Sequence, residues 1–418
     1  MGSRIVCRLL PLLLLLLEGI AAAAEPRLTL SLEDAIARAE TQSPLIRRAD
    51  RNQEVVAALR TGAALVLPSN PTAAVALGDR RDKSSSVPLS QGLEWGVRVE
   101  QAVEIAGQRS TRLAEVAQAM AAAKARAQLA RIETRARVRA AYFGVLIAEA
   151  QAKSARHREE LAEQVLASAR ARVQAGAAAV VETNLAVAEV GRAQHERIEA
   201  DLGVGDARRG LSRLLGLPDA AIIQLASPLA LPPLPVTPLP ELVAAAQSRR
   251  QEVQMLEANK SQLDAMLVRL RREVVPSPTL FVEVQQQQPG QLYVGSGLGL
   301  SLPLWRRNQG EIAVTRAERR RIEEEQSLLE QEIALEVSAL YRSTFARHQQ
   351  ATLWKSEIVP AIESNLDLVG QGWRAGKFDL FRVVQVAREA AEAQRKQLEA
   401  LGSLWQSVIE LDRAVGRP

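Results

Sequence analysis

The chain has 418 residues, with 53 Lys and Arg against 48 Asp and Glu and a formal net charge of +5. Basic and acidic residues interleave, which is typical of solvated helical faces and gives no sign of nucleic-acid binding. One cysteine and three isolated histidines exclude disulfide frameworks and Cys/His metal sites. No P-loop, nucleophile elbow or dinucleotide fingerprint occurs, so we predict neither catalytic residues, nor a cofactor, nor a bound metal, and not an enzyme.

The chain begins with the pattern of a secretory signal peptide (1–24). Arg4 and Arg8 flank the start of an apolar stretch (9–17), and an Ala-x-Ala cleavage motif ends the segment. The only cysteine, Cys7, lies inside this segment, so the mature chain has no thiol chemistry. No other segment carries about 18 consecutive apolar residues, which argues against a transmembrane helix.

The rest of the chain reads as two copies of one unit, joined by a proline-rich linker at 218–238. Repeat 1 (25–217) and repeat 2 (239–418) each combine a helix, two short strands and a long helical hairpin. In repeat 1 these elements are expected at 28–65, 71–79, 93–103 and 107–215. In repeat 2 they are expected at 238–275, 278–285, 291–304 and 310–415.

Glycines mark equivalent positions in the two copies. Gly107 aligns with Gly310, and Gly176 with Gly376. The region from Gly107 to the first hairpin turn lacks proline, and as one helix it would be about 100 Å long at 1.5 Å per residue. Pro360 should kink or break the second hairpin, because proline lacks the N–H that a helix interior needs.

The four predicted strands alternate apolar and polar residues, as strands of a membrane β-barrel do. Four strands are too few to close a barrel, so the chain must associate with copies of itself if these strands lie in lipid. Aromatic residues in or beside the strands are candidates for a membrane girdle. They are Trp95, Phe281, Tyr293 and Trp305.

Several motifs give the sequence a family resemblance. Arg-Val-Gln-Ala-Gly (172–176) and Gly-Trp-Arg-Ala-Gly (372–376) end the outgoing helices, and elbows at 103–109 and 304–310 join strands to helices. Together with the tandem repeat, they resemble the TolC family of outer-membrane efflux proteins. Both elbows and Asn-Pro-Thr (70–72) are similar to the CzcC-like branch, which serves heavy-metal exporters.

The resemblance implies a mainly α fold with β-structure, in which long helical hairpins form an α-barrel and four strands contribute to a trimeric transmembrane β-barrel. It further implies a homotrimeric exit duct in outer-membrane lipid that extends into the periplasm. Such a duct works with a periplasmic adaptor and an inner-membrane pump, and exports solutes passively, heavy-metal cations among them. The alternative is a soluble periplasmic coiled-coil adaptor or structural protein, which would not need four alternating segments placed symmetrically in two repeats.

The resemblance also assigns two groups of site residues at the hairpin ends. The adaptor-docking tip would comprise Arg172, Gly176, Ala177, Arg374, Gly376 and Lys377. The alternative for these positions is a plain helix cap followed by a tight turn. Residues narrowing the pore aperture would be Glu182, Asp379, Arg382 and Gln385. Arg382 departs from the family's acidic pattern, and a local Asp379–Arg382 salt bridge is the alternative there.

Overall fold

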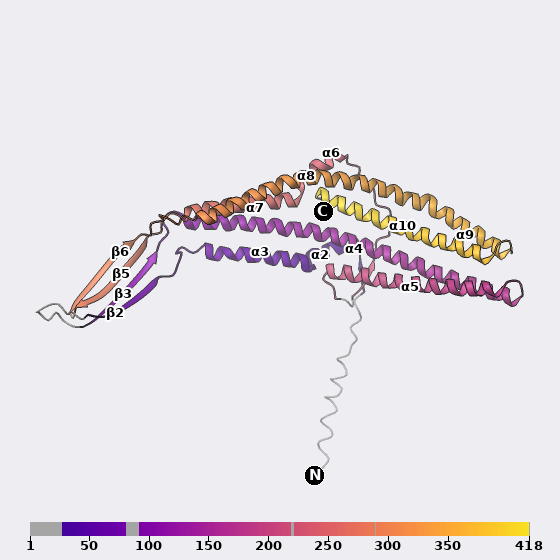
Figure 1. Cartoon of the computed structure of the whole chain (residues 1–418), viewed down its shortest axis with the longest axis horizontal. Coiled ribbons are helices and arrows are strands. Elements are labelled where there is room, and N and C mark those ends of the chain that lie inside the picture. Colours follow the sequence, from indigo (N-terminus) through magenta and orange to yellow (C-terminus); the bar gives the residue numbers. More distant parts are fainter. Residues whose placement is uncertain (1–26, 81–91, 219–220, 289, 418) are drawn as a thin grey trace, which may run out of the picture. The chain divides into compact units, whose positions relative to one another are not determined.

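The computed structural model describes residues 27–80, 92–218, 221–288 and 290–417, so the predicted signal peptide lies outside the described residues. Long helices dominate, with two small sheets (Figure 1). The elements are β1 (Arg27–Leu30), α2 (Leu32–Gln42), α3 (Pro44–Ala63), β2 (Thr72–Arg80), β3 (Gly92–Ala102), α4 (Gln108–Gln174), α5 (Val180–Leu214), β4 (Ile222–Leu225), α6 (Leu239–Arg249), α7 (Gln251–Arg272), β5 (Thr279–Gln288), β6 (Gln291–Gly299), α8 (Gln309–Leu353), the π-helical segment η2 (Trp354–Ile358), α9 (Val359–Arg374) and α10 (Leu380–Val415).

The chain divides into two compact units, and each takes segments from both predicted repeats. Unit 1 comprises Met1–Leu45, Thr134–Leu234 and Arg342–Glu410. Unit 2 comprises Ile46–Glu133, Pro235–Tyr341 and Leu411–Pro418. Equivalent parts of the two copies thus pack together within one unit, as expected when neither copy can bury its apolar faces alone.

The core of unit 1 surrounds Tyr142, which is fully buried. Its hydroxyl donates to the Leu30 carbonyl at 3.0 Å and accepts from the Ser227 backbone N–H at 3.2 Å. These bonds hold α4 against β1 and the end of β4, which pair in parallel. Within the predicted linker, Ile222–Leu225 forms a strand because its apolar side chains and backbone groups find partners in β1.

Neither predicted N-terminal helix is continuous. The segment 28–65 begins in strand β1, not in a helix, and then forms α2 and α3, which are separated at Ser43 (φ −59°, ψ 128°) because the following Pro44 disfavours a helical conformation there. The segment 238–275 breaks at Arg250 with nearly the same dihedrals, although no proline follows.

An ion cluster in unit 2 surrounds the break at Arg250. The Arg250 guanidinium is buried and binds Glu252 at 3.0 Å and Glu336 at 2.6 Å. Arg413 also binds Glu336, at 2.8 Å. Burial by itself would lower the pKa of Arg250. The hydrogen bonds to the two carboxylates outweigh burial and raise that pKa above its ordinary value. A buried arginine needs such partners, so the break in repeat 2 is shaped by charge rather than by proline.

The elbows between strands and long helices are built alike. Gly107 (φ 75°) and Asn308 (φ 53°) both adopt left-handed conformations. The residue after each is a glutamine whose side-chain oxygen accepts a backbone N–H from two residues earlier, at 2.9 Å for Gln108 and 2.7 Å for Gln309. Asn308, not Gly310, is therefore the counterpart of Gly107, which corrects the sequence alignment by two positions.

The predicted interruption near Pro360 takes the form of a π-helical turn at Trp354–Ile358, and Pro360 sits in the first turn of α9. A single widened turn accommodates the backbone that proline leaves unpaired. The first hairpin has no proline here, and α4 continues unbroken for 67 residues.

Candidate functional site

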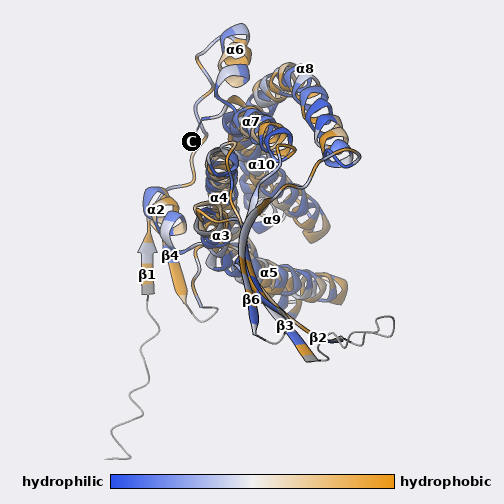
Figure 2. Ribbon diagram, turned by 90° about the vertical axis from the view of Figure 1, so that its left-hand side faces the viewer, coloured by the Kyte–Doolittle hydropathy of each residue, from blue (hydrophilic) through white to orange (hydrophobic). Residues whose placement is uncertain are grey.

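The four-stranded sheet of unit 2 is antiparallel, in the order β2-β3-β5-β6, so β2 and β6 are its outer strands. The register places four valines side by side across the whole sheet: Val75, Val97, Val284 and Val294. All but Val284 are exposed. Apolar and polar residues both occur along these strands (Figure 2), and the register sorts them onto opposite faces.

The opposite face of the sheet is polar. Arg98 pairs with Glu283 across the strands, and its guanidinium lies 3.8 Å from that carboxylate and 3.3 Å from Glu100. It also lies over the ring of Phe281, 3.8 Å from the ring centre. One charged network thus covers this face, with an arginine held between two glutamates and an aromatic ring.

The girdle candidates within the strands lie on both faces of the sheet. Phe281 and Tyr293 belong to the polar face, where they lie against Gly297 and Gly295; a Cβ at either glycine would collide with the ring. Trp95 lies on the apolar face, and its indole N–H donates to Gln286 at 2.7 Å. Trp305 follows β6 and is 83% exposed. The girdle of these four aromatic residues stays a prediction.

The hairpin ends in unit 1 form two turns of the same design. Gly176 (φ 70°) and Gly376 (φ 74°) are both left-handed. The residue after each donates its N–H to a carbonyl five positions back, at 2.8 Å in both copies. This is the Schellman motif, which satisfies the last carbonyls of a helix. The predicted cap-and-turn geometry is therefore present in both copies.

Arg172 joins the two hairpin ends. Its guanidinium donates to the Trp373 carbonyl at 3.0 Å and lies 5.3 Å from the centre of that indole ring. Trp373 is buried in an apolar cluster drawn from all four helices of the two hairpins. Its members are Ala169, Ala186, Trp373, Leu380, Val383 and Val384. The sequence motif at 372–376 contains Trp373, but the sequence alone did not indicate a role for this tryptophan.

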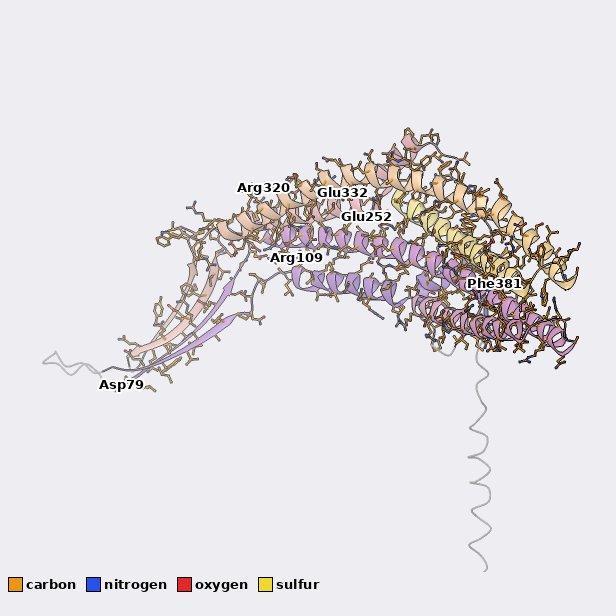
Figure 3. All side chains as sticks on the ribbon, turned by 45° about the vertical axis from the view of Figure 1, so that its right-hand side comes forward. Asp79, Arg109, Glu252, Arg320, Glu332 and Phe381 are labelled. Carbon is orange, nitrogen blue, oxygen red and sulfur yellow. The ribbon has the colours of Figure 1, made fainter. Side chains whose placement is uncertain are left out.

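The remaining docking candidates are exposed: Ala177 in the first turn, and Arg374 and Lys377 in the second. Beside them lie exposed apolar side chains that sequence reasoning missed. They are Val180, Val181, Phe378 and Phe381, the last being 66% exposed on the first turn of α10 (Figure 3). A hollow of about 700 Å³ lies between the two hairpins next to Trp373. The end of unit 1 thus offers both apolar and basic groups to a partner.

The aperture candidates divide in two. Asp379, Arg382 and Gln385 are exposed, whereas Glu182 is half-buried in the first turn of α5. The Asp379 carboxylate accepts the backbone N–H of Arg382 at 2.9 Å and so caps α10. Neither side chain takes part in an ion pair among the described residues, so the Asp379–Arg382 salt bridge is absent. Arg382 stands at the positive end of a helix dipole, where a cation is disfavoured, so local stability does not account for it.

The described residues contain neither a metal site nor a membrane-spanning helix. No group of three or more His, Cys, Asp or Glu side chains there is placed to hold a metal ion. No helix in the same ranges has a stretch both long and apolar enough to cross a membrane.

Comparison with known proteins identifies the family. The profile of the outer membrane efflux protein family matches residues 26–217 and again 237–417. The chain belongs to this family. The two matched segments span nearly the whole chain, so both hairpins and all four sheet strands are family features. The protein is accordingly an outer-membrane efflux channel that extends into the periplasm, and not an enzyme.

Individual relatives agree with the assignment. The cobalt-zinc-cadmium resistance protein CzcC of Cupriavidus metallidurans is 27% identical over 324 residues, which is 75% of each chain. Among solved structures, the outer membrane protein VceC of Vibrio cholerae has a TM-score of 0.72 at 15% identity, covering 92% of this chain and 96% of its own. The open-state MtrE outer membrane channel of Neisseria gonorrhoeae has a TM-score of 0.71 at 19% identity, covering 92% and 89%. The TolC-like fold predicted for this efflux protein is confirmed.

Arg172→Ala tests the link between the hairpin ends. We expect amide hydrogen exchange in the Trp373–Phe378 turn to speed up by about fivefold, because a half-buried charged hydrogen bond of roughly 1 kcal/mol is lost. The matched control is Arg170→Ala, an exposed arginine two residues earlier on α4 without a side-chain partner among the described residues. Equal protection in both variants would show that Arg172 does not hold the turn.

Proposed function

We propose that the protein is the exit duct of a tripartite efflux system, assembled as a homotrimer. The observation that carries this proposal is the sheet β2-β3-β5-β6, which has one apolar face, one charged face and two outer strands with a free edge each. In lipid, unpaired backbone groups cost several kcal/mol each, so β2 of one copy must pair with β6 of the next. Three copies would close a twelve-stranded barrel, with the Arg98 face turned to the lumen.

Divalent metal cations are the proposed cargo. The named relative CzcC is a cobalt-zinc-cadmium resistance protein. The polar face of the sheet carries Glu94, Glu100 and Glu283 against Arg98, an acidic balance that favours cations inside a lumen. No side-chain group in the described residues is placed to select one metal, so the selecting step would belong to the inner-membrane pump.

The proposed docking surface for the periplasmic adaptor is the end of unit 1. The turns at Gly176 and Gly376 set its backbone, and the exposed apolar side chains flanking them supply area to bury on binding. Arg374 and Lys377 add positive charge around this surface. The soluble coiled-coil alternative loses support, because the family profile covers both repeats, strands included.

The first test of the proposed function is the mass of the full-length protein extracted from outer membranes in detergent. Light scattering, corrected for bound detergent, should give three times the chain mass. The trimer should also migrate as a compact band on a gel until it is heated, because a closed barrel unfolds only at high temperature. A monomer that stays in the soluble fraction would rule out the duct.

Gly376→Val tests the docking turn. Valine strains a left-handed backbone by roughly 1–2 kcal/mol, while open space around the site admits its side chain. We expect an intact trimer and at least a fivefold lower zinc tolerance in cells that depend on this protein. The control is Gly376→Asn, because asparagine tolerates the left-handed region and should keep tolerance near normal. Unchanged tolerance in the valine variant would remove the docking role.

Arg382→Asp tests the proposed aperture. Replacing an exposed cation by an anion changes the charge by two per copy, so the ratio of cation to anion permeability in planar bilayers should rise by about twofold or more. Arg395→Asp, farther along α10 and also exposed, controls for a general change in charge. If both variants keep the selectivity of the original protein, Arg382 does not line the pore.

A further inference from the structure

The elbow after β6, defined here as residues 300–308, has an unusual composition. Four apolar side chains are exposed along it: Leu300 (51%), Leu302 (63%), Leu304 (56%) and Trp305 (83%). Arg306 and Arg307 follow directly and are exposed as well. Tryptophan followed by arginine is the combination that suits the boundary between hydrocarbon and lipid headgroups.

The elbow is held against the end of α7, which brings more arginines to it. The Asn308 side chain donates to the Leu270 carbonyl at 3.0 Å. The next two residues of α7, Arg271 and Arg272, are exposed. Four arginines therefore gather within unit 2: Arg271, Arg272, Arg306 and Arg307.

Most of this positive charge is not neutralised. Arg271, Arg272 and Arg306 make no side-chain hydrogen bond or ion pair among the described residues, and Arg307 donates only to the Pro303 carbonyl, at 3.0 Å. Glu273 is already bound by Arg269, at 2.8 Å. Two further acids lie near Arg306. Glu311, in the first turn of α8, and Glu318 line a cavity of about 690 Å³ together with Arg306. Neither carboxylate forms an ion pair with any of the four arginines among the described residues.

The helix dipoles favour only two of the four arginines. Arg271 and Arg272 suit the negative end of the α7 dipole. Arg306 and Arg307 lie just ahead of α8, at the positive end of its dipole, where cations are disfavoured. In the first repeat the equivalent positions, set by the Gly107–Asn308 match, hold Ile105 and Ala106. The elbow geometry therefore does not require arginine.

We propose that these four arginines bind the phosphates of anionic phospholipids in the leaflet of the outer membrane that faces the periplasm. This inference rests on the proposed function, which puts the sheet in the outer membrane and the helices in the periplasm, and the elbow joins the two. Apolar side chains continue from β6 through Leu300 and Leu302 to Trp305, so the acyl chains would meet the apolar residues and the headgroups the guanidinium groups. The planar guanidinium group of arginine can donate two parallel hydrogen bonds to two oxygens of one phosphate.

The test compares lipid binding to the full-length protein in detergent by native mass spectrometry. The probes are phosphatidylglycerol and phosphatidylethanolamine with identical acyl chains. Wild-type protein should prefer phosphatidylglycerol. The variant Arg271→Gln/Arg272→Gln/Arg306→Gln should lose at least tenfold in affinity for it, since each basic residue near an anionic surface contributes about fivefold.

The control removes three other exposed, unpaired arginines of α8, as Arg316→Gln/Arg320→Gln/Arg342→Gln. Arg320 lies on α8 beyond its first turns (Figure 3), outside the elbow, and the control should bind phosphatidylglycerol like the wild type. An equal loss in control and test variants would overturn the proposal, as would unchanged binding in the test variant. Should the triple variant fail to assemble, Arg306→Gln alone should cost about fivefold, and no loss there would overturn the proposal too.

A soluble competitor separates lipid from free phosphate. Glycerol 3-phosphate carries a similar phosphate ester without acyl chains, and at equal concentration it should leave bound phosphatidylglycerol in place. Displacement would assign the arginines to a soluble phosphate ester and overturn the lipid proposal.

Discussion

The main constraint on the proposed duct is the need to satisfy backbone groups at the outer edges of one small sheet. Among the described residues, β2 and β6 each pair with a single strand, and an edge exposed to hydrocarbon is prohibitively costly. In the outer membrane, a β-sheet with two such edges would be stable only when copies pair edge to edge.

The two repeats solve equivalent structural problems with different chemistry. At the strand-to-helix elbow, repeat 1 uses Gly107 and repeat 2 uses Asn308, whose side chain additionally ties the elbow to α7. At the break between the first two helices, one copy uses proline after Ser43 and the other uses the Arg250 ion cluster. Duplication has therefore left one backbone plan with two distinct surfaces, and the basic elbow belongs only to the second.

Much of the fold was predictable because it depends on local patterns. Alternation placed three of the sheet strands to within three residues at each end, whereas the fourth, predicted at 291–304, ends at Gly299. Glycines at 176 and 376 marked both turns, since only a left-handed residue closes a Schellman motif. Features set by distant partners were not predictable. β4 needs β1, nearly 200 residues away, and the faces of Phe281 and Tyr293 depend on register between strands. At the hairpin ends, the turns were predictable from local sequence, whereas the Arg172–Trp373 hydrogen bond, which joins distant residues, was not.

The proposed duct carries negative charge in one part and positive charge in another. The polar face of the sheet is acidic on balance, whereas the first turn of α10 presents Arg382 where the helix dipole already supplies positive potential. In a trimer, the three copies of each charged region would form a ring around the pore. A cation leaving through such a duct would meet a repelling ring and an attracting lumen, with no side-chain group in the described residues to hold it. That arrangement favours passage over binding, because a conduit that bound its cargo tightly would release it slowly.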